Sequence, residues 1–413
     1  SGTRVERTLS TWSDGMAAKK NGDPLKILSL FSGCGGLDLG FSGGFSFLHK
    51  NYPKLNTQVV FANDFDTDAA TCYNSNKLLT KDGVNSICKD VREIATSEMP
   101  NFDIMLAGFP CQPFSNAGNR KGVNDDNGRG TLFEVCERVI KEKSEKGYKP
   151  KAFLFENVRG ILSSKMADGK TTVPEEIRKR MEHLGYNVSM QLVCSSNYGV
   201  PQNRFRVLII GVDKKLNKEF SFENLEETVT RYQIPSKDFG RQEKLLLGSI
   251  LQDVPNDEIW EYTAATQRMI EQIGSCDNDL DFFRNDFRLE KIPDRLKEGR
   301  SWKDIPPNLL TPRFKKIYDN PQKYHSPKFF RRFALGEING TITASSQPEN
   351  CGITHPFEHR RFSVREIARI QSFPDNFDFK AIPLQSRYKV IGNAVPPVMA
   401  WVVAKTLTNL LEK

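Results

Sequence analysis

The hydrophobic pattern from Leu25 onward alternates between short apolar runs and longer amphipathic segments. The runs are LKILSLFSG, TQVVFAND, FDIMLAGF, KAFLFENV and FRVLIIGV, and each carries a glycine, an acid or a polar turn at its end. Short continuous apolar runs separated by helix-length stretches are typical of parallel strands that helices cover on both faces. The pattern therefore predicts an α/β fold with a doubly wound sheet.

The regular alternation stops after Gly211, where a long stretch rich in charge, proline and aromatic residues begins. Helical spacing returns in FSVREIARIQSFP, and VMAWVVAKTLTNLLEK predicts an apolar helix that returns to the first domain. We expect a flexible arm or expression remnant (1–24), a first domain (25–214 with 386–413), a smaller irregular domain (215–350) and a hinge segment with a helix (351–385).

The composition is that of a globular protein, because 38% of the 413 residues are hydrophobic and can bury a sizeable core. No apolar run reaches the roughly 18 residues that a membrane helix needs. The N-terminus lacks the charged-then-apolar order of a signal peptide. We expect a soluble cytoplasmic protein with no membrane partner.

The formal charge is +8, and most of the excess lies in residues 285–332, where 13 Lys and Arg face 6 Asp and Glu. Seven aromatic residues are interleaved with these cations: Phe287, Trp302, Phe314, Tyr318, Tyr324, Phe329 and Phe330. That composition suits a surface for a polyanion. A solvated face on an ordinary small domain explains it equally well at this point.

The eight cysteines contain no Cys-x-x-Cys pair that could begin a zinc or redox site. His355 and His359 have helical metal-ligand spacing, but Pro356 between them favours a turn over a regular helix. We therefore expect no metal.

The run LSLFSGCGGLDLG passes from a strand into glycines, where backbone in an α/β fold can approach a nucleotide-like ligand. Asp38 stands where a dinucleotide fingerprint needs glycine, which argues against hydride transfer. Asp64 ends the next strand and could accept both ribose hydroxyls, Phe65 could stack on a purine, and Asp90 could accept from an exocyclic amine. Each acid alone could be a helix N-cap, but together they fit one adenosine.

Cys111 follows a later strand at the same edge of the sheet, between Pro110 and Pro113. The two prolines stiffen the loop on either side of the thiol, which favours a nucleophile over a buried structural cysteine.

The segment FENVRG delivers Glu156 and Asn157 to that edge, where the acid could protonate a heterocycle and the amide could hold the carboxylate. Arg204 and Arg206 lie two residues apart on one strand face, and could cover a phosphate and a ring carbonyl. A surface pair is the alternative for the two arginines.

The motifs FSGCGG, PCQPFS, FENV, QNRFR and GNAVPP, in that order, resemble those of DNA (cytosine-5) methyltransferases from about Leu25 to Lys413. The resemblance implies a Rossmann-like methyltransferase domain that uses S-adenosyl-L-methionine, and a target cytosine swung out of the duplex. It implies that Cys111 attacks ring carbon 6, that Glu156 engages ring nitrogen 3, and that Arg204 holds Glu156 and the base with Arg206 nearby.

The resemblance also implies which residues line the cofactor. They are Phe31, Ser32, Gly33, Cys34, Gly35, Gly36, Leu37, Asp64, Phe65, Asp90, Val91, Pro110, Leu132, Asn393 and Val395. The irregular domain would be the target recognition domain. The resemblance therefore implies that the basic stretch binds double-stranded DNA.

The compact chain resembles bacterial or phage modification enzymes, which implies a monomer in the bacterial cytoplasm, near the nucleoid. A restriction endonuclease would share its target site without a stable complex. Two alternatives stay open: a tRNA cytosine-5 methyltransferase of the same fold, and a DNA-binding relative without catalysis. The middle region lacks the Cys-Phe-Thr triplet typical of the tRNA branch.

Overall fold

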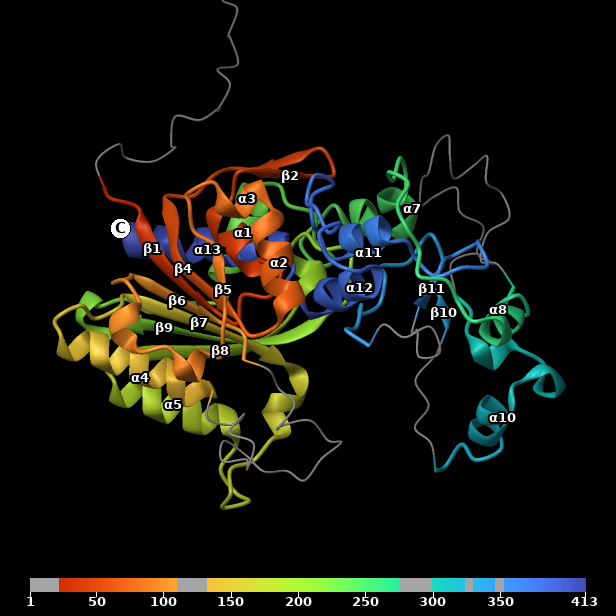
Figure 1. Ribbon diagram of the computed structural model, residues 1–413, viewed down its shortest axis with the longest axis horizontal. Coiled ribbons are helices and arrows are strands. Elements are labelled where there is room, and N and C mark those ends of the chain that lie inside the picture. Colours follow the sequence, from red (N-terminus) through yellow and green to blue (C-terminus); the bar gives the residue numbers. More distant parts are fainter. Residues whose placement is uncertain (1–21, 110–131, 275–298, 324–329, 346–352) are drawn as a thin grey trace, which may run out of the picture.

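A single seven-stranded sheet forms the centre of the computed structural model, which describes residues 22–109, 132–274, 299–323, 330–345 and 353–413 (Figure 1). The strand order is β5-β4-β1-β6-β7-β9-β8. In chain order these strands are β1 (Leu25–Leu30), β4 (Thr57–Asp64), β5 (Ser86–Cys88), β6 (Ile104–Ala107), β7 (Ala152–Val158), β8 (Tyr186–Cys194) and β9 (Phe205–Asp213). A separate antiparallel hairpin pairs β2 (Phe45–Phe47) with β3 (Lys50–Tyr52).

The five strands from β5 to β7 are parallel, as the apolar runs predict, but β9 is antiparallel to both β7 and β8. The prediction that FRVLIIGV is a parallel strand is therefore wrong. Only residues 195–204 separate β8 from β9, without the crossover helix that a parallel pair needs. An apolar run indicates that a strand is buried on both faces, but it does not indicate the direction of that strand.

Strand β8 was not predicted, because YNVSMQLVC alternates polar and apolar residues instead of forming an apolar run. It lies at the edge of the sheet, and several of its residues are only partly buried.

Helices cover both faces of the sheet in two layers (Figure 1). One layer holds α4 (Leu132–Glu145) and α5 (Val173–His183), whose apolar faces join one core cluster. The other layer holds α1 (Gly36–Ser42), α2 (Thr67–Ser75), α3 (Lys77–Thr80), α6 (Asn224–Arg231) and α13 (Pro397–Glu412). This arrangement confirms the doubly wound α/β fold.

The C-terminal segment forms α11 (Val364–Ile370), α12 (Leu384–Asn393) and α13, as the returning helical spacing predicts. Residues Leu384–Glu412 are long and apolar enough to cross a membrane by composition alone, but 83% of their most apolar window is buried inside the protein. Gly40 of α1 packs so closely on α13 that a Cβ there would lie 2.3 Å from the Ala400 Cβ. The segment is therefore part of the protein core.

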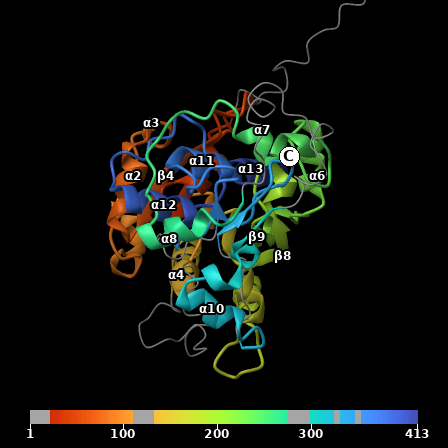
Figure 2. The same cartoon turned by 90° about the vertical axis from the view of Figure 1, so that its right-hand side faces the viewer.

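A second, smaller core lies at the end of the molecule that faces the viewer in Figure 2, around α8 (Ala264–Ile270) and α10 (Pro312–Tyr318). It contains Tyr262, Met269, Ile270, Ile273, Trp302, Ile305, Phe314 and Phe330. The short parallel pair β10 (Arg331–Arg332) and β11 (Ile353–Thr354) lies beside it. The helix α7 (Leu247–Ile250) and residues such as Leu225 and Leu251 instead join the main core. Among the described residues, the first member of the second core along the chain is Tyr262.

Arg332 shows that the basic stretch is not uniformly a surface. Its side chain is fully buried, and its guanidinium donates to the carbonyl oxygens of Ile273, His355 and Glu358 and to His359 Nδ1. A bend over residues 356–360 follows His355 and contains His359, so no helix joins the two histidines, as Pro356 predicts. Arg332 therefore ties three segments of the second core together.

Candidate active site

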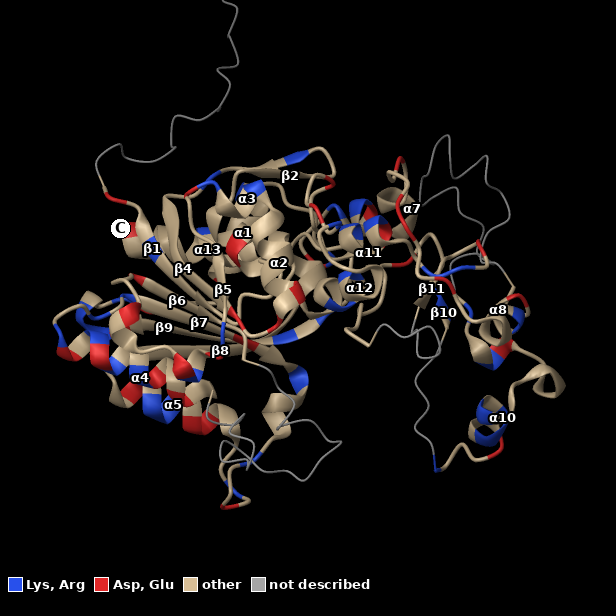
Figure 3. Ribbon diagram, in the orientation of Figure 1, with Lys and Arg blue, Asp and Glu red and all other residues tan. Residues whose placement is uncertain are grey.

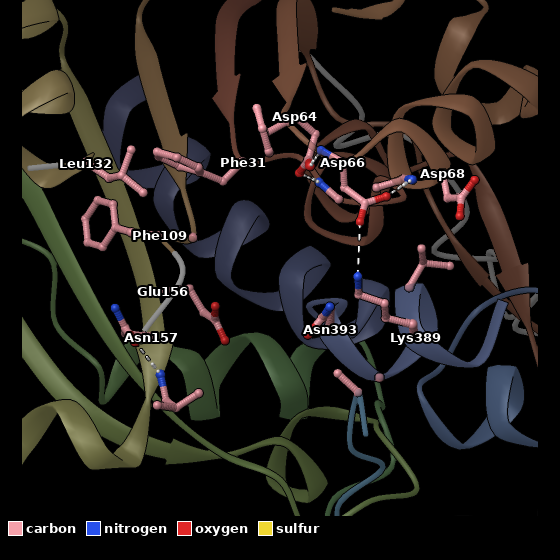
Figure 4. A pocket seen from close by; sticks show the side chains of 18 of the residues that line it. Phe31, Asp64, Asp66, Asp68, Phe109, Leu132, Glu156, Asn157, Lys389 and Asn393 are labelled. Carbon is pink, nitrogen blue, oxygen red and sulfur yellow. Dashed lines mark hydrogen bonds and ion pairs between the residues drawn. The ribbon is translucent and has the colours of Figure 1, made fainter. Parts of the chain in front are cut away.

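The carboxyl ends of the parallel strands open onto a cleft of about 1350 Å³. Ligands in open α/β sheets bind at this edge. Figure 4 shows side chains from both ends of the chain directed into the cleft. The sequence-predicted residues that line it are Phe31, Gly33, Asp64, Phe65, Asp90, Val91, Leu132, Glu156, Asn157, Arg204, Arg206 and Asn393.

Asp64 joins the end of β4 to the glycine turn after β1. Its carboxylate accepts the peptide N–H of Gly33 and that of Asp66, each at 2.8 Å. Burial raises the pKa of Asp64, and the two N–H donors oppose that rise. Because each carboxylate oxygen keeps a second lone pair, Asp64 can still accept two hydroxyl groups.

Among the described residues, Phe65 is the most exposed large hydrophobic residue. Its exposed fraction is 74%, and it lines the cleft. An aromatic ring left in water beside a cleft is suited to stack on a planar ligand. Asp90 lies at the same end of the cleft, where it caps a short 3-10 helix and pairs with Arg92 at 2.6 Å. Hydrogen bonds from Arg92 lower the pKa of Asp90. The N-cap alternative is thus realised for Asp90, whereas Asp64 caps no helix.

Six predicted cofactor residues do not line the cleft: Ser32, Cys34, Gly35, Gly36, Leu37 and Val395. Cys34 and Leu37 belong to the main core. Gly36 lies against the chain before α13, where a Cβ would be 2.2 Å from the Val395 carbonyl oxygen. Gly35 has φ +99°, which glycine adopts readily. Gly36 allows two backbone segments to approach closely, and Gly35 allows the turn. Of the residues in this turn, only Phe31 and Gly33 line the cleft.

Arg206, and not Arg204, is the described ion-pair partner of Glu156. Arg206 Nε lies 3.0 Å from Glu156 Oε1, because antiparallel β9 brings Arg206 beside the end of β7. Arg204 lies just before β9 and donates to the carbonyl oxygens of Ile342 (2.7 Å) and Gly392 (2.8 Å). The structure therefore corrects the expectation that Arg204 holds Glu156, because Arg206 forms that ion pair. Burial, aided by the charge of Arg206, lowers the pKa of Arg204 to about 9.

Two buried donors at the cleft have no hydrogen-bond acceptor among the residues that the structure describes. They are Nδ2 of Asn157 and Nε of Arg204. The Asn157 Oδ1 accepts from the Val158 peptide N–H, so the amide does not hold the Glu156 carboxylate as expected. A buried donor without an acceptor is costly, and a ligand carbonyl in the cleft would relieve that cost.

Lys389 is a cleft residue that the sequence reasoning missed. Its ammonium lies 3.3 Å from Asp66 Oδ2 and joins α12 to the start of α2 (Figure 4). Lys389 precedes the predicted residue Asn393 by four positions, so helical spacing places both on one face of α12. That spacing is the signal that could have found it.

Cys111 and Pro110 lie outside the described residues, which stop at Phe109 and resume at Leu132. Phe109 is buried between Phe31 and Phe155, with ring centroids 6.1 and 5.1 Å away. Gly108 is close to Glu156, since a Cβ on it would be 3.3 Å from Glu156 Oε2. The chain toward Cys111 therefore leaves β6 beside Glu156.

The fold and the cleft define an α/β enzyme of the methyltransferase class. A model of the C-5 cytosine-specific DNA methylase family matches residues 25–409, and the chain belongs to that family. It is a DNA (cytosine-5) methyltransferase, and the chemistry of its family depends on S-adenosyl-L-methionine and acts on DNA.

Curated relatives match over nearly the whole chain. The chain is 32% identical to the Type II methyltransferase M.FnuDI of Fusobacterium nucleatum, over 94% of this chain and 95% of that protein. It is 32% identical to the Type II methyltransferase M.NgoFVII of Neisseria gonorrhoeae, over 94% and 87%. Among solved structures, a DNA modification methyltransferase from an E. coli prophage has a TM-score of 0.57 and 21% identity, covering 94% of this chain and all (100%) of that one. The S. pombe Dnmt2 methyltransferase also has a TM-score of 0.57, at 17% identity, over 94% and 98%. The two structures support the fold alone.

Proposed function

We propose that this enzyme methylates carbon 5 of a flipped-out cytosine in a specific duplex sequence, and so protects DNA from a restriction endonuclease that cuts the same site. Two curated relatives, each 32% identical in sequence to this chain, are named Type II methyltransferases and come from bacteria. Such an enzyme would act as a monomer in the cytoplasm, without a stable complex with the nuclease.

The cofactor would lie at the end of the cleft formed by Phe31, Gly33, Asp64 and Asp90. Asp64 has lone pairs left for the ribose hydroxyls, and the exposed ring of Phe65 can stack on the adenine. Asn393 and Lys389 would bound the methionine end. When bound, S-adenosyl-L-methionine supplies the methyl group as a sulfonium.

The observation that carries the proposal is a pair of buried donors, Asn157 Nδ2 and Arg204 Nε, which find no acceptor in the described part of the chain and lie at one cleft with the Arg206–Glu156 ion pair. A base with a ring carbonyl and a ring nitrogen would give acceptors to the donors and engage Glu156. This arrangement suits a pyrimidine that has left the duplex.

Cys111 would be the nucleophile. It follows the buried Phe109 by two positions in the sequence. Its thiolate would add to carbon 6 of cytosine while Glu156 supports the developing charge at nitrogen 3, which makes carbon 5 nucleophilic toward the methyl group. Loss of the proton from carbon 5 and departure of the thiolate would then restore the aromatic ring.

The second core, with its basic and aromatic residues, would carry target recognition, and residues 215–350 with the hinge 351–385 are its proposed extent. The two alternatives that the sequence left open, a tRNA substrate and a DNA-binding relative without catalysis, do not fit the family to which the chain belongs. Glu156, Asn157, Arg204 and Arg206 gather at one cleft, and a binding protein without catalysis would not need that arrangement.

The test is a trapping experiment on duplex DNA that carries 5-fluorocytosine in place of cytosine, with the methyl donor present. Fluorine cannot leave carbon 5 as a proton does, so we expect a stable covalent adduct that peptide mapping assigns to Cys111. Cys111→Ser should form no adduct and transfer no methyl group, while it binds the cofactor within about threefold of the wild type. An adduct on another side chain, or methyl transfer to tRNA but not to DNA, would overturn the proposal.

A further inference from the structure

A second cavity, of about 500 Å³, lies beside the β2–β3 hairpin, and none of its described lining residues also lines the active-site cleft. Figure 1 shows the hairpin above α1 and α3, away from the layer of α4 and α5. The cavity lies between the hairpin turn and the short 3-10 helix Gln242–Leu245. Its volume falls within the range of ordinary small-molecule sites.

The lining of this cavity is basic. Lys50 belongs to the hairpin, and His49 lies at the hairpin turn. Arg241 caps the start of the 3-10 helix, and Lys244 lies within that helix. None of the described residues that line the cavity is an Asp or a Glu. Among the described residues, Lys50, Arg241 and Lys244 form no ion pair with a carboxylate. Blue segments on the hairpin are visible in Figure 3.

The three cations are close enough to affect one another. Burial lowers the pKa of Lys50, and the charges of Arg241 and Lys244 lower it further. The Lys50 ammonium is held in place, because it donates to the Tyr232 carbonyl oxygen at 2.5 Å and lies 5.9 Å from the centre of the Tyr52 ring. Like charges held together without a counter-charge are unfavourable, and a bound anion would remove that repulsion.

The backbone around the cavity is strained. Four of the nine non-glycine residues with positive φ in the described chain line it: Leu48 (47°), His49 (65°), Gln233 (52°) and Arg241 (62°). Left-handed conformations are unfavourable for such residues and gather at functional sites. The two-residue hairpin turn would be easier with Asn-Gly than with Leu-His. The strain at Leu48, His49 and Arg241 occurs where the basic side chains converge.

We propose that this cavity binds a compact phosphate-bearing anion of nucleotide size, with Lys50, Arg241 and Lys244 as the phosphate-binding residues. Three cations in one pocket match a ligand with several charges on neighbouring groups, such as a di- or triphosphate. Extended nucleic acid spaces its phosphates along a strand, which favours an open stripe of cations over a pocket. The polar side chains of Asn51 and Gln233 would contact the rest of the ligand. The inference is independent of the methyl-transfer site.

The test is calorimetric titration of the full chain with inorganic pyrophosphate and triphosphate at constant ionic strength. S-adenosylhomocysteine is kept in excess so that the probes meet only this cavity. The double variant Arg241→Asn, Lys244→Gln removes two charges, and Asn at 241 tolerates the left-handed backbone. Lys237→Gln is the matched control, because Lys237 is exposed near the same segment but does not line the cavity.

We expect the double variant to bind triphosphate at least tenfold more weakly than the wild type, while the control stays within twofold and both variants keep the wild-type rate of methyl transfer. A double variant that binds triphosphate as well as the control would overturn the proposal. It would also be overturned if the wild type binds neither polyphosphate but a non-target duplex loses affinity in the double variant, because the cations would then hold a DNA strand.

Discussion

Arg206 and Glu156 approach to 3.0 Å where β9 passes antiparallel to the end of β7. The two residues lie 50 positions apart in the chain. Residue 158 on β7 pairs in register with residue 206 on β9, so the side chain of Arg206 reaches back to Glu156 along the sheet edge. The pairing of β7 with β9 thus positions Glu156, the acid that would engage the base.

Replacing Arg206 by Gln removes the positive charge and shortens the side chain, but leaves an amide nitrogen at the position of the arginine Nε. We expect methyl transfer to fall about 100-fold, with cofactor affinity within about threefold of the wild type, because the change affects the catalytic end of the cleft. Steady-state transfer of labelled methyl groups and a separate cofactor titration measure the two effects. The control is Lys151→Gln, which removes a weaker ion pair (3.7 Å to Asp103) just before β7. Equal losses in both variants would mean that Arg206 supports only the fold.

Gly36→Ala tests whether this glycine contacts the cofactor or only packs. The added Cβ would lie 2.2 Å from the Val395 carbonyl oxygen, so we expect unfolding in urea to become easier by roughly 2 kcal/mol or more. The folded protein should keep its cofactor affinity within a few fold. Gly160→Ala is the control, because its Cβ would meet nothing nearer than Val158 Cγ2 at 4.0 Å. Unchanged stability with a large loss of cofactor affinity would contradict the packing role.

Asp38 predicts a pH dependence of stability. It is fully buried on α1 and accepts hydrogen bonds from Ser29 Oγ (2.6 Å) and Tyr73 OH (2.7 Å). Burial raises its pKa from 3.8 to about 6. Since the folded state holds the proton more tightly, the contribution of Asp38 to stability is complete below about pH 4 and is lost as the pH rises through about 6.

Asp38→Asn does not titrate, so its stability should improve relative to the wild type by on the order of 3 kcal/mol between about pH 4 and pH 7. Urea unfolding across that range measures the difference. Tyr73→Phe removes a donor that favours the charged carboxylate, and should move the transition of the otherwise native protein to higher pH. Parallel stability curves for wild type and Asp38→Asn would show that the buried carboxyl does not titrate in this range.

The exposed cations of the second core should govern the salt dependence of DNA binding. Lys303, Arg313 and Lys316 are exposed. If they meet phosphates, replacing all three by Gln should reduce the slope of log affinity against log salt by about 1 to 3. Fluorescence anisotropy at several salt concentrations gives the slope, and an unchanged slope would move the DNA surface elsewhere.

Arg332 belongs to the same basic stretch but should behave differently. Because its guanidinium serves several buried carbonyl oxygens, Arg332→Gln should destabilise the second core by about 3 kcal/mol. Hydrogen exchange in Ala264–Ile270 and Pro312–Tyr318 should then rise, while the salt slope of the remaining folded protein stays near the wild-type value. A changed slope without faster exchange would make Arg332 a DNA contact.

The order of the elements and the edge at which the chemistry gathers could be predicted from the sequence. Asp64, Phe65, Glu156 and Asn157 each follow an apolar run, and parallel strands end at one edge, so their meeting follows from the pattern. The pattern could not show that β9 is antiparallel, since an apolar run is the same in either direction. It therefore could not show which arginine would reach Glu156.

The sequence by itself determined the fold class, the family, and the set of residue types that cytosine methylation needs, because those depend on periodicity and on motifs a few residues long. Only the tertiary structure decided which members of that set face the cleft, that Gly36 packs on Val395, that Arg332 is buried, and that three cations converge at the hairpin. These features depend on distances between residues far apart in the chain, and such distances are set by packing and strand direction, which no local pattern encodes.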